Sequence, residues 1–327
     1  FTSATDNYNI GIGFQAGYAV TTGTNNTLIG GLAGDALTTG SSNVAVGYGA
    51  LTTDDVGQWN VAIGRDALAS QNIASAANTY NTAVGGAAGT GITTGTFNTL
   101  IGGLAGDAIT TGGNNTAVGL QALSTTTTAV DNTAVGFQSL FLNTTGTFNT
   151  AVGSRSLDAN TTGSGNTSVG EDSLSANTTA NDNSAFGQNA LKANTTGTRN
   201  NAFGFGAADA TTTSLDVAAF GTNSLGSNTT GTQNAGFGTN TLFTNLTGSY
   251  NTALGHFALE TATGSHNTVV GTQAGIAVTT GAQNTIVGAL CADDLTSGSG
   301  NVLVGYNLDM GNAATDQTIC IGYGITS

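Results

Sequence analysis

Residues 131–153 read DNTAVGFQSLFLNTTGTFNTAVG, and the pentad Asn-Thr-Ala-Val-Gly or a close variant of it recurs down the chain. The glycines that close these two pentads, Gly136 and Gly153, are 17 residues apart. The closing glycines are Gly13, Gly30, Gly47, Gly64, Gly85, Gly102, Gly119, Gly136, Gly153, Gly170, Gly187, Gly204, Gly221, Gly238, Gly255, Gly271, Gly288, Gly305 and Gly322. A fixed short period is typical of a solenoid, whose turns bury their apolar faces against neighbouring turns.

Each period predicts a short strand and turns rich in Gly, Asn and Thr. The 327-residue chain contains no proline, which would remove a hydrogen-bond donor from a ladder between turns. We therefore expect an all-β fold, a parallel β-solenoid with 17-residue turns, about 19 in number, one for each closing glycine. The repeats predict one continuous domain over residues 1–327. Because pentads start and stop near the chain ends, this domain is expected to be uncapped at both ends.

The pentad places apolar residues on both faces of the predicted strand, since neighbouring side chains point in opposite directions. The residue before the closing glycine is apolar in every turn, and we expect it to fill the solenoid core with a leucine four residues after the glycine. The predicted core residues are Val46, Val84, Val118, Val135, Val152, Leu123, Leu140, Leu157 and Leu174. The preceding residue is mostly alanine, and we expect it to contact another copy of the chain. The candidate interface residues are Ala45, Ala83, Ala117, Ala134, Ala151 and Ala185. The alternative is a flattened solenoid in which this second face packs on another turn of the same chain.

In six turns the leucine is missing and an apolar residue stands three positions later instead. Gly34 accompanies Leu37, and Gly106 accompanies Ile109. Because emptying a buried leucine site costs about 2–5 kcal/mol, this exchange predicts one space in the core that is filled from either position.

A second glycine column lies ten residues after the first, as at Gly95 and Gly146, and predicts a tight turn with positive φ. Paired threonines such as Thr144 and Thr145 precede it, often with an asparagine, and would stack as ladders one turn apart. The extra residues between Ser70 and Asn78 and the shorter period near Glu260 to Thr263 fall outside the pentads, so we expect them in loops.

Composition excludes several kinds of partner. Only four residues are Lys or Arg, and the formal net charge is −14. Phosphate groups are bound by clustered cations, so we expect neither nucleic acid nor an anionic membrane as a partner. No apolar run is long enough for a transmembrane helix, and we expect no membrane insertion by this segment.

No pattern of residues predicts catalysis, a metal site or a cofactor. The two histidines, His256 and His266, occupy different places in the repeat. Asp35, Asp107 and Asp293 share a place in the repeat and are expected to be solvated turn residues. Cys291 and Cys320 replace small or aliphatic residues and are expected to be small buried side chains, with a disulfide as the minor alternative. The chain is therefore predicted not to be an enzyme.

Two pentads, Asn149 to Gly153 and Asn251 to Gly255, carry a resemblance that the repeats extend over nearly the whole chain. The array resembles the YadA-like head repeats of trimeric autotransporter adhesins. It is also similar to repeat arrays of phage tail fibres and large bacterial surface proteins. The resemblance implies a left-handed parallel β-roll, a homotrimer, and adhesion or fibre-shaft duty.

Three functions follow as hypotheses. The first is a structural or adhesive fibre segment, extracellular, on a cell surface or in a virion fibre, with further copies of the chain as partners and an unknown host-surface or matrix ligand. The second is an extracellular filament subunit whose copies stack end to end. The third is a module that binds ice or another ordered surface through threonine ladders, which the sequence interrupts at Asp54, Asp55, Ala180 and near Thr263.

Overall fold

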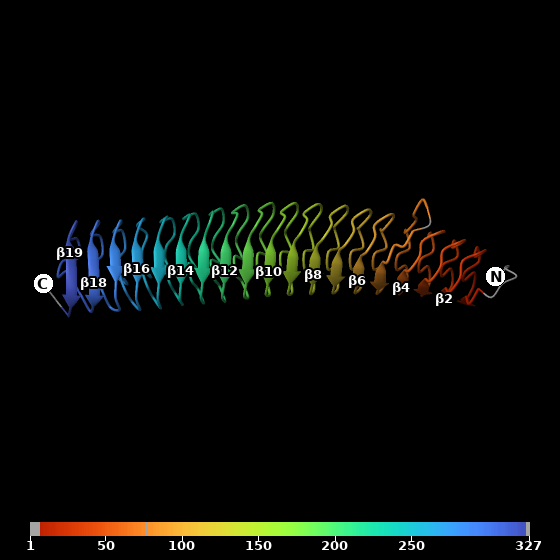
Figure 1. The fold of residues 1–327 in the computed structure, drawn as a ribbon, viewed down its shortest axis with the longest axis horizontal. Coiled ribbons are helices and arrows are strands. Elements are labelled where there is room, and N and C mark those ends of the chain that lie inside the picture. The colour runs from red at the N-terminus through yellow and green to blue at the C-terminus, as the bar shows by residue number, and fades with distance from the viewer. Residues whose placement is uncertain (1–6, 76, 325–327) are drawn as a thin grey trace. The chain divides into compact units, whose positions relative to one another are not determined.

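The computed structural model describes residues 7–75 and 77–324, which contain nineteen strands and no helix. The chain forms two compact units, Phe1–Gly165 and Asn166–Ser327. In each unit parallel strands lie side by side, one from every turn of about 17 residues (Figure 1). The predicted all-parallel β-solenoid is confirmed, whereas the expectation of one domain over residues 1–327 stays a prediction.

The first unit contains β1 to β9. Their bounds are Ile10–Ile12, Thr27–Ile29, Val44–Val46, Val61–Ile63, Thr82–Val84, Thr99–Ile101, Thr116–Val118, Thr133–Val135 and Thr150–Val152. The second unit contains β10 to β19. Their bounds are Thr167–Val169, Ser184–Phe186, Asn201–Phe203, Ala218–Phe220, Ala235–Phe237, Thr252–Leu254, Thr268–Val270, Thr285–Val287, Val302–Tyr306 and Ile319–Tyr323.

The register between neighbouring strands follows the sequence period. Ala117 of β7 pairs with Ala134 of β8, and Val118 pairs with Val135. Every strand thus presents the same repeat position to its neighbours, so side chains of one kind form columns. The extra residues near Ser70 lie in a loop between β4 and β5 that projects from the stack (Figure 1), and the shorter period lies between β15 and β16. Both predicted loop positions are confirmed.

The two faces of the strand are the reverse of the prediction. The middle residue of the strand, here the inner column, points into the solenoid. Ala45, Ala83, Ala117, Ala134, Ala151 and Ala185 are fully buried within the chain, so they are not available to a second copy. The last residue of the strand, here the outer column, points outward. Val46, Val84, Val118, Val135 and Val152 are only half-buried and do not belong to the core.

The leucines explain this reversal. Leu123, Leu140, Leu157 and Leu174 are fully buried, as predicted. Each occupies most of the space within its turn and leaves room for only a small residue on the strand. In the turns where Gly34, Gly106 and Gly275 replace the leucine, the inner strand residue is large, namely Leu28, Leu100 and Val269. A Cβ on Gly34 would lie 2.8 Å from both Leu28 and Leu37, and all three positions therefore share one space.

The second glycine column serves close packing and not a positive φ. Gly95 is not among the residues with positive φ, and a Cβ there would lie 2.3 Å from the carbonyl oxygen of Gly112 in the next turn. The closing glycines are the ones that need positive φ, as at Gly136 with φ 131°. Left-handed backbone also occurs at non-glycine residues such as Leu140, φ 54°. Such a conformation costs on the order of 1–3 kcal/mol and persists because the surrounding contacts fix it.

Buried asparagines join the turns at one corner, directly before each strand. The backbone N–H of Asn115 donates to Oδ1 of Asn98 at 3.1 Å, and Nδ2 of Asn98 donates to the carbonyl of Gly112 at 3.0 Å. In the first unit the column consists of Asn26, Asn43, Asn60, Asn81, Asn98, Asn115, Asn132 and Asn149. In the second it consists of Asn166, Asn183, Asn200, Asn234, Asn251, Asn267, Asn284 and Asn301, with Val217 in one turn. We call this column the asparagine ladder.

Asn200→Ala tests the ladder. Asn200 accepts the backbone N–H of Val217 at 3.0 Å and donates to the carbonyl of Ser214 at 2.9 Å. Because the substitution leaves both groups buried without this partner, the free energy of unfolding should fall by about 2–4 kcal/mol in urea titrations followed by circular dichroism. The matched control is Asn201→Ala, since Asn201 is exposed and alanine stands at that strand position in β13 and β14. Equal losses in the two variants would contradict the assigned role.

Candidate functional site: the outer face of the sheet

The outer face of each sheet carries two side chains per strand, the first and the third. In most strands both are half-buried while the middle residue is fully buried. The third residues form the outer column. In the first unit it consists of Ile12, Ile29, Val46, Ile63, Val84, Ile101, Val118, Val135 and Val152. Ile63 and Ile101 keep 38% and 40% of their surface exposed. No segment of the described residues covers this column, whereas the alanine face expected at an interface is buried within the chain itself.

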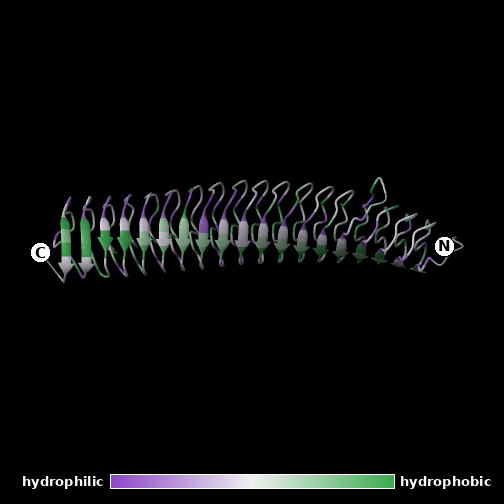
Figure 2. Cartoon of the chain, viewed as in Figure 1, coloured by the Kyte–Doolittle hydropathy of each residue, from purple (hydrophilic) through white to green (hydrophobic). Residues whose placement is uncertain are grey.

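In the second unit the outer column includes a stack of phenylalanines. The rings of Phe186, Phe203, Phe220 and Phe237 stack in sequence, with centroids 4.7, 4.7 and 4.8 Å apart and planes within 9°. Ala218 and Ala235 stand beside Phe220 and Phe237 on the same face. The column continues through Leu254, which is 50% exposed. Figure 2 shows that hydrophobic colouring gathers on the strands and that the connecting turns are mostly paler or hydrophilic.

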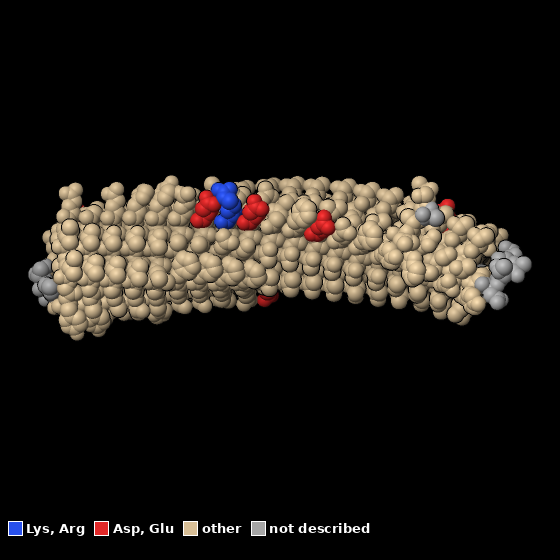
Figure 3. All heavy atoms as spheres, viewed as in Figure 1, with Lys and Arg blue, Asp and Glu red and all other residues tan. Residues whose placement is uncertain are grey.

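Charged side chains are sparse on the face drawn in Figure 3, where the one blue group lies between two red groups. Arg199 donates to both carboxylate oxygens of Asp216, at 2.6 and 3.1 Å, and this pairing lowers the pKa of Asp216. Lys192 lies 3.3 Å from Asp172. Opposite charges therefore neutralise these cations in pairs, and the apolar outer column is the dominant chemical feature of the sheet face.

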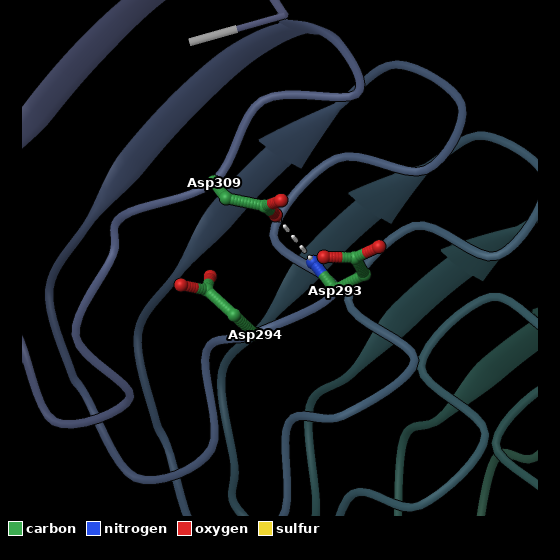
Figure 4. Close-up of side chains that lie close together, drawn as sticks. All are labelled: Asp293, Asp294 and Asp309. Atoms are coloured by element: carbon green, nitrogen blue, oxygen red, sulfur yellow. Dashed lines mark hydrogen bonds between the residues drawn. The ribbon is translucent and has the colours of Figure 1, made fainter. Parts of the chain in front are cut away.

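A cluster of three carboxylates lies near the last strands, where Asp293, Asp294 and Asp309 come together (Figure 4). Their nearest ligand atoms lie within 4.8 Å of one another, and the backbone N–H of Asp293 donates to Oδ1 of Asp309 at 3.3 Å. Burial, the hydrogen bond and charge of Asp293, and the charge of Asp294 raise the pKa of Asp309 to about 6. Three carboxylates are an oxygen donor set of the kind that hard divalent cations accept.

This cluster was not predicted from the sequence, in which Asp293 is expected to be a solvated turn residue like Asp35 and Asp107. Asp35 and Asp107 accept hydrogen bonds from Thr52 and Ser124 of the next turn. The available signal was Asp309, which stands four residues after a closing glycine, where most turns carry leucine.

The cysteines and histidines occupy separate surroundings. Cys291 is buried, as expected, and burial raises the pKa of its thiol to about 11, which makes it a poor nucleophile at neutral pH. Cys320 is half-buried and is also free. His266 stacks on Tyr250 at 4.7 Å, whereas His256 lies against the edge of Phe257.

A shallow polar pocket opens on the turns of the second unit. Gln283, Ser297, Ser299, Gly300, Asp316 and Gln317 line it. Among the residues described, no helix is long and apolar enough to cross a membrane.

Comparison of the chain with protein families, with curated proteins and with solved structures finds no match. The similarity to YadA-like head repeats therefore rests on the residues of the pentads.

The carboxylate cluster predicts a pH dependence of stability. The pKa of Asp309 is raised to about 6 from the model-compound value of 3.8, so the folded state binds its proton more tightly. The corresponding stabilisation is full below pH 4 and is lost as the pH rises through 6. Asp309→Asn should therefore raise the thermal midpoint relative to wild type at pH 7 and have much less effect at pH 4. Thermal unfolding in the presence of a chelator measures this.

The control for this experiment is Asp182→Asn, because Asp182 is exposed in a turn of the same unit. Asp309→Asn midpoints that lie below wild type at pH 7 would contradict the assigned repulsion.

Proposed function

We propose that this chain is a segment of a structural or adhesive fibre, in which copies associate side by side through the outer column. The observation that carries the proposal is the uncovered apolar column on the sheet face, from Ile29 to Val135 in the first unit and across the phenylalanine stack in the second. Apolar surface of this extent on a soluble protein is typical of an interface.

Repetition makes the column suitable for this role. Fixed strand pairing places every outer residue at the same height relative to its turn, as for Val118 and Val135. A second copy that lies parallel to the first meets the same chemistry at each turn, and weak contacts then add along the stack. The resemblance of the pentads to YadA-like heads supports a left-handed roll, a homotrimer, and a place outside the cell or in a virion fibre.

Val135→Glu tests the association. Val135 is half-buried in one chain and lies on the face of β8 opposite the buried Ala134, so the fold should persist. In an assembly the change removes the burial of a valine side chain, which stabilises association by about 1.5–3 kcal/mol. It also places the new carboxylates of neighbouring copies close to one another. Light scattering of purified wild type should give a mass of three chains. The Val135→Glu assembly should dissociate at protein concentrations at least about tenfold higher than those at which the wild-type assembly dissociates.

Asn114→Asp is the matched control. It adds the same charge at an exposed turn position, where Asp131 stands one turn later, and the trimer mass should be retained. A wild-type mass of one chain would contradict the proposal.

A further inference from the structure

A second repetitive surface lies on the turns, away from the outer column. Most turns carry an exposed residue nine positions after the closing glycine, and here we call this set the threonine row. The first unit has a run of five at Thr94, Thr111, Thr128, Thr145 and Thr162. The second unit has a run of five at Thr179, Thr196, Thr213, Thr230 and Thr247.

The row differs from the threonines directly before it in what its hydroxyl groups do. The preceding threonines bond to the next turn: the hydroxyl of Thr110 donates to the carbonyl of Thr127, and that of Thr195 to Thr212, both at 3.1 Å. By contrast, no hydroxyl of either five-residue run makes a hydrogen bond within the described part of the chain. Internal stability therefore uses the first threonine of each pair and leaves the hydroxyl and methyl of the second to solvent.

The spacing of the row is set by the backbone. The N–H of Thr110 donates to the carbonyl of Thr127 at 2.8 Å, and the N–H of Thr195 to that of Thr212 at 2.9 Å. Hydrogen-bonded turns of this kind stack about 4.8 Å apart, so each run spans four such intervals. A ligand that repeats at a similar spacing would contact every threonine without any rearrangement of the protein.

Two of the residues expected to interrupt the threonine ladders do not lie in the threonine row. Ala180 is 2% exposed and Asp54 is fully buried, so both point into the solenoid and not into the row. The runs are therefore longer and more regular than the sequence alone indicates. Val56 and the buried Ile73 do occupy row positions, and the run that ends at Thr162 begins after them, at Thr94.

We propose that the threonine row binds ordered water at the surface of ice. Each threonine hydroxyl can donate one hydrogen bond to water and accept another. The neighbouring methyl group can fill a gap in an ordered water lattice. Carbohydrate is the less suitable partner, because both five-residue runs consist of threonine alone and offer no aromatic face on which a sugar ring could stack. The row itself carries no charge, so a charged polymer gains no ion pair from it.

The test uses the full chain and polycrystalline ice in a sucrose solution as the probe. Wild type should slow ice recrystallisation and separate the freezing from the melting temperature. A variant with Thr128→Lys, Thr145→Lys, Thr196→Lys and Thr213→Lys interrupts both runs with long charged side chains. It should need at least about tenfold more protein for the same effect.

A control with two lysines outside the row carries Ser175→Lys and Gln188→Lys. Lys192 occupies the position of Ser175 one turn later, and Gln188 already donates to Glu171, so lysine fits both sites. The control should retain activity on ice, and circular dichroism should show the same thermal midpoint for all three proteins. Wild type without activity on ice, or a row variant equal to wild type, overturns the proposal. Because Val135→Glu leaves the row intact, a loss of association without a loss of activity separates this inference from the fibre proposal.

Discussion

The bond between a buried side-chain amide and the backbone of the next turn is the constraint on which the rest of the structure depends. Strands of three residues make too few hydrogen bonds to fix their own alignment. Oδ1 of Asn98 accepts a hydrogen bond from the backbone of the following turn, and Nδ2 of Asn98 donates to a carbonyl of its own turn. Both hydrogen bonds are buried. A shift in the register between turns would leave these buried amides unpaired, which costs about 1–3 kcal/mol for each group. The ladder therefore sets the register that every other column inherits.

Much of the fold was predictable from the sequence because repetition makes its signal strong. The period located the strands, and the exchange between Gly34 and Leu37 predicted a shared space in the core that the structure contains. Alternation showed that the two strand faces differ, but it did not show which face is inside. The larger strand residue is the one expected in the core, whereas the buried residues are Leu140 and the small Ala134.

Two large inner residues that occur together with glycines held the missing information. Leu28 and Leu100 occur in turns with Gly34 and Gly106, where a Cβ would approach them to 2.8 and 2.7 Å. This pattern places the inner column against the leucine site, and it was visible in the sequence. The carboxylate cluster was harder to predict, since Asp293 and Asp309 come together only when the stacking of turns is known.

The regularity of the ladder also determines how such a chain can change in length. Its bonds run from each turn to the following one, so a complete turn can be added or removed while all its neighbours keep their partners. An extra fragment is tolerated only where it bulges outward, as between β4 and β5. Gene duplication in units of one turn would thus lengthen the protein without a new fold having to evolve, and each added copy would extend both of its outward surfaces by one step.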